Sequence, residues 1–387
     1  MNRNLLRIAA ATAITLTSSL SLAASDVELP KTIAMTAYGT GSTGYTQMVS
    51  IGNLLRNEYG TSVRILPGEN DVSRMTPLRL GRVPLCACGI ASYFASEGVL
   101  MFASRTWGPQ PLRVITTSTA SFGLGPAVAG DIGVKTPADL KGKRVAYVRG
   151  DDAINIGMEA FLAFGGLGWD DVEKITYPGY SAAFQGIVAN QVDATYGSTT
   201  APSAQQLAAS PRGIVWPAVD PEDKAGWKRL NEVAPFFQPH EATAVAGDDY
   251  GPDHPWVGAT YPYPIVLGTD KLEDKLAYNL VKVFTEDQDK YKDAAPGNEG
   301  YAQSQQNMEW IVPFHAGVVQ YYKDVGIWTA AMQTHQNELI KRQQVLADAW
   351  KTYIADDAPS DAAAFQTGWM KARAGALEAN NLPIVFN

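Results

Sequence analysis

Apolar and polar positions along the first two thirds of the chain follow two periods, one typical of strands and one typical of helices. Short runs that are apolar or alternating predict strands at 31–38, 63–68, 84–90 and 111–119. Amphipathic spacing predicts a helix over 46–59 and a shorter helix over 72–83, which Pro77 interrupts. Strands that alternate with helices indicate parallel sheets flanked by helices, so the pattern predicts an α/β fold.

A second series of the same kind starts near residue 131. It predicts a strand over 144–148 and a helix over 151–167 with one apolar face. The strand–loop–helix starts at 38–46 and 148–156 indicate two similar lobes. Because ligands of open α/β sheets bind at the carboxyl ends of the strands, a cleft is expected where the two lobes face each other.

The last third of the chain is irregular at first and then helical. The stretch 220–262 is rich in Pro, Asp and aromatic residues, and we expect it to be irregular. From about residue 270 onward, helical spacing dominates.

These patterns divide the chain into two lobes connected by two crossings. We expect lobe 1 to span 24–121, lobe 2 to span 122–258, and 259–387 to return to lobe 1 and end in helices. Hinges are expected near 119–125, which is Gly-rich, and near 256–264, which is rich in Pro and Tyr.

The first residues have the pattern of a secretory signal peptide. Arg3 and Arg7 precede an apolar run from Ile8 to Leu22, and small residues fit cleavage after Ala23. A membrane anchor is the alternative, but the many Ser and Thr residues and the small-residue ending argue against it. We therefore expect 1–23 to be removed and the mature protein to be periplasmic.

A glycine loop, YGTGSTGY at 38–45, follows the first predicted strand and opens the first predicted helix. G-x-G-x-x-G in this context is typical of dinucleotide sites, and Glu69 lies near where a ribose-binding acid would be. An exported protein meets no NAD pool, however. We therefore expect the loop to hold a carboxylate with the same backbone N–H groups, and we expect no cofactor.

Composition narrows the remaining classes of function. The formal net charge is −8 and no cluster of Lys and Arg occurs, which argues against nucleic-acid binding. The only cysteines, Cys86 and Cys88, are two residues apart on a predicted strand, where a disulfide does not close easily. We expect two small buried hydrophobic residues there. A metal pair is the alternative, but none of the four His residues lies at ligand spacing from another, and no metal site is predicted.

Several stretches resemble the TAXI family, the extracytoplasmic solute receptors of TRAP transporters. They are 139–150, 186–210, 261–284 and 313–328, and the last, PFHAGVVQYYKDVGIW, is the most diagnostic. The resemblance implies a type II periplasmic-binding-protein fold that closes on a small organic anion. It also implies delivery to a Na⁺-coupled permease with a small and a large membrane subunit. A monomer without enzymatic activity is expected.

The resemblance also implies where the ligand binds. The glycine loop is similar to the family's first ligand loop, although a tight turn with Ser42 or Thr43 as helix cap would explain it too. Arg74 takes the place of a family Asn and can fork a carboxylate, but a solvated helix arginine is equally expected. Tyr261 lies in the second hinge beside Tyr263, where packing is the alternative. The complete expected set is Thr40, Gly41, Ser42, Thr43, Gly44, Asn70, Arg74, Cys88, Gly89, Arg149, Asp152, Ala153, Ser198, Thr199, Thr200 and Tyr261.

One loop departs from the family pattern. Where the family reads G-S-G-T, this chain has Asp151-Asp152-Ala153-Ile154 at a helix start. Helix capping by Asp explains this without any ligand. If the two aspartates have a function instead, the ligand differs from the family's usual ligand and places an amine, a hydroxyl or a bridging cation at this loop. A plain dicarboxylate would be repelled here unless Arg149 compensates.

Three other functions remain open from the sequence. The protein could serve a sensory kinase, or a transporter of another class, with the same binding chemistry. An exported enzyme is a further alternative, but the sequence shows no nucleophile with an evident base.

Overall fold

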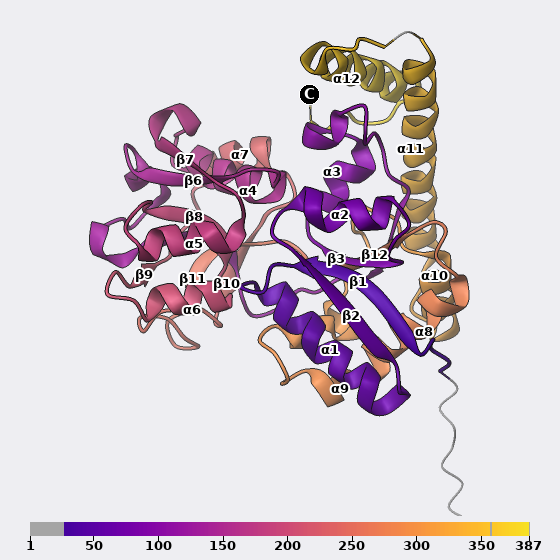
Figure 1. Cartoon of the computed structure of the whole chain (residues 1–387), viewed down its shortest axis with the longest axis horizontal. Helices are drawn as coiled ribbons and strands as arrows, with labels where there is room; N and C mark the ends of the chain where they lie inside the picture. The colour runs from indigo at the N-terminus through magenta and orange to yellow at the C-terminus, as the bar shows by residue number, and fades with distance from the viewer. Residues whose placement is uncertain (1–26, 357, 387) are drawn as a thin grey trace, which may run out of the picture.

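The computed structural model describes residues 27–356 and 358–386, and it shows two α/β lobes side by side (Figure 1). The predicted fold class, a two-lobed α/β protein with a helical C-terminal part, is confirmed. The predicted signal peptide lies outside the described residues. Within those residues, no helix is both long and apolar enough to cross a bilayer.

Lobe 1 is built on a five-stranded sheet with the order β2-β1-β3-β12-β4. Strand β1 runs parallel to β2 and β3, whereas β12 is antiparallel to β3 and β4. The strands are β1 (Thr32–Tyr38), β2 (Ser62–Gly68), β3 (Leu85–Cys88), β4 (Leu112–Thr116) and β12 (Ile265–Thr269). The helices of this lobe are α1 (Thr43–Tyr59), α2 (Asp71–Arg79), α3 (Ala91–Glu97), α8 (Asp274–Glu286), α9 (Gln288–Tyr291) and α10 (Ala316–Asp324).

Lobe 2 repeats this plan with a sheet of order β7-β6-β8-β5-β9. Strand β6 is parallel to β7 and β8, and β5 is antiparallel to β8 and β9. The strands are β5 (Leu124–Ala129), β6 (Arg144–Val148), β7 (Glu173–Tyr177), β8 (Ala194–Ser198) and β9 (Ile214–Val215). The helices are α4 (Asp152–Phe164), α5 (Tyr180–Val188), α6 (Pro202–Ala208) and α7 (Lys224–Val233).

The chain passes between the two sheets twice. It leaves the lobe 1 sheet after Thr116 and enters the lobe 2 sheet at Leu124. It returns through a hairpin of β10 (Gln238–Ala242) and β11 (Trp256–Thr260), and re-enters the first sheet at Ile265. Both crossings fall where hinges were expected.

Three expectations about local structure were wrong. The stretch 220–262 is not irregular, because it contains α7 and the β10–β11 hairpin, anchored by the buried ring of Trp256 against Trp216. Pro77 does not interrupt α2, because it lies in the last turn of that short helix. Cys86 and Cys88 are joined in a disulfide. Their side chains share one face of β3, and the 5.6 Å between their Cα atoms lies in the range that disulfides span.

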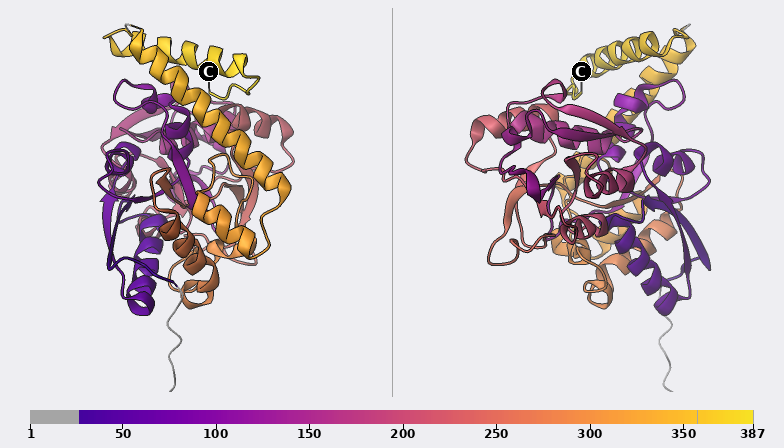
Figure 2. Two further views of the ribbon diagram at one scale, coloured as in Figure 1. Left: turned by 90° about the vertical axis from the view of Figure 1, so that its right-hand side faces the viewer. Right: turned by 60° about the vertical axis from the view of Figure 1, so that its left-hand side comes forward.

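Two long helices, α11 (Ala330–Ala355) and α12 (Ala362–Ala379), extend from the end of lobe 1 (Figure 2). They pack against each other and against α3 and the 3₁₀ turn at Leu100–Ala103. A separate small core of Ala103, Phe365 and Trp369 fills this contact. The C-terminal pair is therefore anchored to one lobe by its own apolar cluster.

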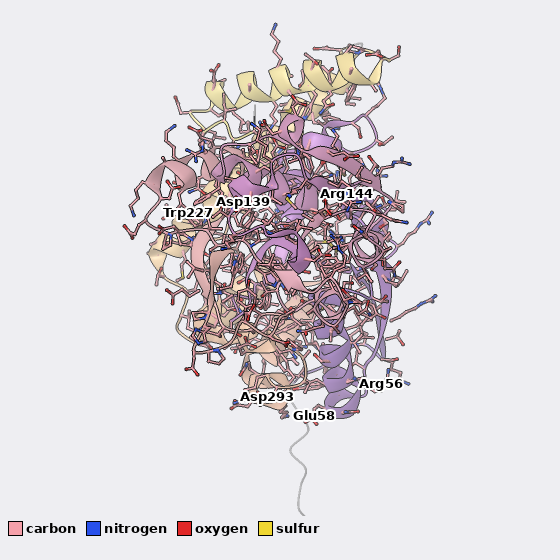
Figure 3. All side chains as sticks on the ribbon, turned by 90° about the vertical axis from the view of Figure 1, so that its left-hand side faces the viewer. Arg56, Glu58, Asp139, Arg144, Trp227 and Asp293 are labelled. Carbon is pink, nitrogen blue, oxygen red and sulfur yellow. A yellow bond between two sulfur atoms is a disulfide. The ribbon has the colours of Figure 1, made fainter. Side chains whose placement is uncertain are left out.

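Most charged side chains lie on the surface, as Arg56, Glu58 and Asp293 do (Figure 3). Buried charges concentrate in a few places. One cluster joins Glu97 of α3 to Arg342 of α11 and Arg373 of α12. Another, formed by Asp71, Arg74 and Asp151, lies where the two lobes meet.

Candidate ligand-binding site

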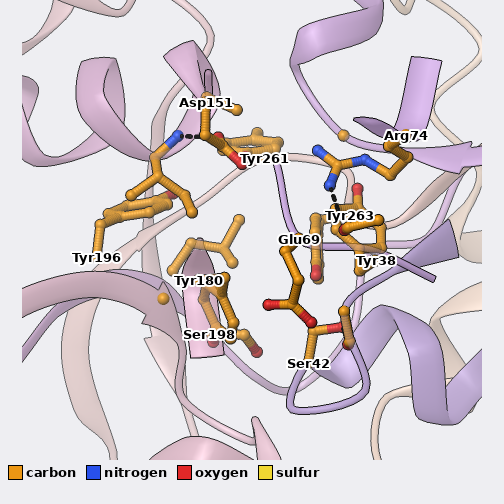
Figure 4. A pocket seen from close by; sticks show the side chains of 17 residues that line it. Tyr38, Ser42, Glu69, Arg74, Asp151, Tyr180, Tyr196, Ser198, Tyr261 and Tyr263 are labelled. Atoms are coloured by element: carbon orange, nitrogen blue, oxygen red, sulfur yellow. Dashed lines mark hydrogen bonds between the residues drawn. The ribbon is translucent and has the colours of Figure 1, made fainter. Parts of the chain in front are cut away.

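A cavity of about 50 Å³ lies between the lobes (Figure 4). It is bordered by the carboxyl ends of β1, β2 and β8 and by the start of α4, so it occupies the position that parallel α/β sheets use for ligands. Lobe 1 and the return crossing contribute Tyr38, Gly39, Ser42, Gly68, Glu69, Arg74, Gly89, Tyr261 and Tyr263. Lobe 2 contributes Leu124, Asp151, Ala153, Ile154, Tyr180, Tyr196, Gly197 and Ser198.

The structure brings part of the expected residue set to this cavity. Those that line it are Ser42, Arg74, Gly89, Ala153, Ser198 and Tyr261. The expected residues that are not among those lining it are Thr40, Gly41, Thr43, Gly44, Asn70, Cys88, Arg149, Asp152, Thr199 and Thr200. Six of the sixteen expected residues thus line the cavity, and that they bind a ligand stays a prediction.

The glycine loop contains residues of both groups. Ser42 caps α1 by accepting from the Tyr45 N–H. The space that a Cβ at Gly41 would need is taken by Ser203 of lobe 2, whose Oγ would be 2.3 Å away. At Gly44 the same space is filled by the ring of Tyr38. These two glycines thus admit protein atoms at a tight interface, which the sequence could not distinguish from room for a ligand.

Hydrogen bonds join the lobes directly around the cavity. The Thr43 hydroxyl pairs with Ser198 and Thr200, each at 3.0 Å. Backbone N–H groups also donate across the interface, among them Ser203 to Gly41 O at 3.1 Å, Val72 to Gly150 O at 3.2 Å, Tyr180 to Glu69 O at 3.1 Å, Ala153 to Asp71 Oδ2 at 2.9 Å and Ser181 to Glu69 Oε2 at 3.1 Å. The lobes are therefore closed onto each other in this structure.

The buried charges at this interface are unbalanced. Arg74 forms an ion pair with Asp71, and its guanidinium lies over the Tyr38 ring, 4.2 Å from the ring centre. Asp151 approaches the same group from lobe 2 and caps α4 by accepting from the Ile154 N–H. Asp71 is 0% exposed and Asp151 is 2% exposed. Two buried carboxyl groups thus lie near one guanidinium, and only Asp71 forms an ion pair with it.

Burial and mutual repulsion change the acidity of these groups. Loss of solvent raises the pKa of Asp71, although Arg74 opposes this effect. Loss of solvent and the charge of Asp71 together hold the pKa of Asp151 well above its usual range. Burial also raises the pKa of Asp152 to about 6, although its carboxylate accepts from the Met101 N–H of lobe 1. The Asp151 and Asp152 side chains thus make different contacts and do not converge on one position.

Acid is expected to favour this closed arrangement. Because the pKa of Asp151 and Asp152 is higher when the lobes bury them, the closed form binds protons more tightly than a solvated open form. This advantage is present at about pH 4 and is lost as the pH rises through about 6, the closed-form pKa of Asp152. Small-angle scattering of the ligand-free protein should give a smaller radius of gyration at the lower pH. The double variant Asp151→Asn/Asp152→Asn should lose this response. If the radius of gyration of the unmodified protein does not change with pH, the prediction is contradicted.

Five tyrosines complete the wall, and the sequence analysis identified only Tyr261 among them as a ligand residue. Burial raises the pKa of the Tyr180 hydroxyl and of the Tyr263 hydroxyl, so both are held in their neutral form. Tyr38 and Tyr196 complete the set. Glu69 and Asp151 were also missing from the expected set. A usable signal existed for Tyr38 and Glu69, because each lies at or next to the carboxyl end of a strand.

The comparison with protein families identifies the chain at the level of family. A model of the NMT1-like family matches residues 35–326, which is well over half of the chain. The chain belongs to the NMT1-like family. The match spans both lobes and ends before α11, so the two C-terminal helices of this NMT1-like protein lie outside it. No curated protein sequence matches the chain.

Solved structures with a similar architecture are distant. A protein from Bordetella bronchiseptica is 19% identical, with 70% of this chain and 77% of that chain covered and a TM-score of 0.43. The alkanesulfonate-binding protein of Xanthomonas axonopodis, bound to MOPS, is 16% identical over 84% and 93% of the two chains, with a TM-score of 0.37. PhnD1 of Prochlorococcus marinus, in complex with methylphosphonate, is 12% identical over 78% and 100%, with a TM-score of 0.41. These similarities are too low to indicate what the NMT1-like protein binds.

Proposed function

We propose that this NMT1-like protein is an exported receptor that captures a small organic solute by closing its two lobes. The observation that carries the proposal is the cavity between the lobes, whose wall takes buried polar and charged side chains from both. A site divided in this way binds fully only when the lobes meet, so ligand binding and closure are coupled. The closed form is then the state that a membrane partner recognises.

The partner that we propose is a TRAP-type permease with a small and a large membrane subunit. This assignment rests on the resemblance of 139–150, 186–210, 261–284 and 313–328 to the TAXI family. The most diagnostic stretch forms α10, which packs against α8 of lobe 1. Export to the periplasm is supported by the signal-peptide pattern of 1–23.

A thermal-shift screen combined with small-angle scattering tests this function. The mature protein, starting at Ala24, would be screened against carboxylates, keto acids, amino acids, amines, sugars and polyols. A receptor of this kind should show a rise in melting temperature with a ligand, by mass action, and a smaller radius of gyration in its presence. If no compound in these classes stabilises or compacts the protein, the proposed function is contradicted.

Gly41→Val separates closure from simple surface binding. A Cβ at Gly41 would already approach Ser203 Oγ to 2.3 Å, and the two γ-carbons of Val cannot be accommodated while the lobes are closed. We expect the ligand from the screen to bind at least about tenfold more weakly to this variant, with no compaction. Gly168→Val is the matched control, because nothing lies within 4 Å of a Cβ there. Equal affinity in both variants would argue against closure on the ligand.

A further inference from the structure

The wall of the cavity carries more negative than positive charge. Arg74, the guanidinium in the wall, is already paired with Asp71. Glu69 and Asp151 also face the cavity, and in the described part of the chain no Lys or Arg forms an ion pair with either. Glu69 Oε2 accepts only from the Ser181 N–H in that part. A dicarboxylate ligand would therefore bring two further negative charges to a wall that already has a carboxylate in excess.

Aromatic rings form much of the remaining wall. Tyr38 and Tyr263 have ring centres 5.0 Å apart, and Tyr263 meets Tyr261 edge-on at 6.5 Å. Tyr180 and Tyr196 lie on the lobe 2 side of the same space (Figure 4). The faces of tyrosine rings attract organic cations, most strongly where water is excluded, and carboxylates at the edge of such a box add to the attraction.

Three polar groups in the wall, the Tyr38 hydroxyl, the Tyr196 hydroxyl and Arg74 Nε, have no hydrogen-bond partner within the described residues. Arg74 is 3% exposed and Tyr38 is 9% exposed. Because a buried donor left unpaired is unfavourable, such groups indicate where an oxygen atom of a bound molecule would be received.

From this combination we propose that the ligand is a compact organic cation, with an ammonium group held by Glu69 and Asp151 inside the tyrosine box. Its polar end carries an oxygen that accepts from the Tyr38 hydroxyl and Arg74 Nε. This inference rests on the proposed receptor function and replaces the organic anion that the family resemblance implies. The cavity of about 50 Å³ is smaller than the ~150 Å³ cavity that holds benzene, so the ligand has few heavy atoms.

Binding of the cation should also displace a proton from the Asp151 carboxyl. Burial and the charge of Asp71 raise the pKa of Asp151, so closure without a ligand favours the protonated form of this carboxyl. An ammonium group beside it favours the ionised form, and binding should release that proton to the buffer. A ligand bound elsewhere on the surface would not cause this release.

Matched probes that differ only in charge test the proposal. Titration calorimetry would compare the cations ethanolamine, methylammonium and ethylammonium with 1-propanol, the neutral isostere of ethanolamine, and with the dicarboxylates malonate and succinate. We expect at least one of the cations to bind at least about 100-fold more tightly than the neutral isostere. We also expect proton release when the titration is repeated in buffers of different ionisation enthalpy.

Glu69→Gln tests the assigned residue. The variant keeps a side-chain oxygen for the Ser181 N–H and removes only the negative charge. We expect the affinity for the bound cation to fall at least about 30-fold, and the Glu338→Gln control, on the exposed surface of α11, to leave it unchanged.

Each outcome decides between the two proposals. Binding of malonate or succinate with no binding of the three cations would overturn the cation proposal and leave the receptor function standing. Cation binding that Glu69→Gln does not weaken would overturn the assigned site. If none of the probes binds, the cation proposal fails, and the broader screen then decides whether the receptor function fails with it.

Discussion

Replacing Glu97 with Gln should lower the free energy of unfolding by about 3–5 kcal/mol, because it leaves two buried guanidinium groups without a counter-charge. Glu97 ends α3, and its carboxylate is held between Arg342 of α11 and Arg373 of α12. The Arg342 Nη2–Glu97 Oε2 distance is 2.8 Å, and both Glu97 and Arg373 are almost completely buried. Gln keeps the shape of the side chain but not the charge, so the loss reports electrostatics and not packing.

The same substitution should loosen the C-terminal helices before the lobes. Arg373 also donates to the carbonyl groups of Val385 and Phe386, so its position fixes the end of the chain as well. Urea unfolding measures the change in stability, and limited proteolysis in α11–α12 reports where the loss is concentrated. Glu338→Gln, exposed on the same α11, is the control. A loss below about 1 kcal/mol for Glu97→Gln would show that the two arginines find water or other partners.

The sequence predicted the two lobes because the same strand–loop–helix pattern occurs near the start of each lobe. Ser42 and Asp151 cap α1 and α4, and both cap residues come directly from the loops that marked the lobe starts. The sequence did not predict the β10–β11 hairpin, since QPHEA and WVGAT show little alternation and depend on the packing of Trp256. The Glu97 cluster could not be predicted from local patterns either, because Arg342 and Arg373 follow Glu97 by 245 and 276 positions in the sequence.

Only part of the ligand-residue set expected from the sequence lines the cavity between the lobes. Residues next to the glycine loop and at the ends of strands were found because local motifs mark them. The role of Gly41 was not predicted, because the atom that fills its space, Ser203 Oγ, belongs to the other lobe. The ion pair between Arg74 and Asp71 changes the role expected for this arginine. A guanidinium that appears free for a carboxylate ligand in the sequence is already neutralised in the fold.

Arg74→Met should weaken ligand binding by at least about 100-fold at pH 8, the second large effect that the structure predicts. In the closed form this variant leaves the buried Asp71 without its ion-pair partner, whereas an open form hydrates this carboxylate. Removing one partner from a buried ion cluster costs about 3–5 kcal/mol, and 3 kcal/mol already corresponds to more than 100-fold in affinity. Met fills much of the space of the arginine stem, so the lobe 1 core should remain packed.

The pH dependence of this loss identifies its cause. Arg74 lowers the pKa of both Asp71 and Asp151, so without it both carboxyl groups take up protons more readily and become neutral at a higher pH. Neutral carboxyls need no counter-charge, and the penalty should therefore shrink as the pH falls from about 8 to about 5. The double variant Arg74→Met/Asp71→Asn should recover part of the affinity at pH 8, while Arg64→Met, on the exposed side of β2, should have no effect. A loss of the same size at every pH, with no recovery in the double variant, would mean that Arg74 contributes packing against Tyr38 and direct contact with the ligand, and that the charge balance between the lobes does not govern closure.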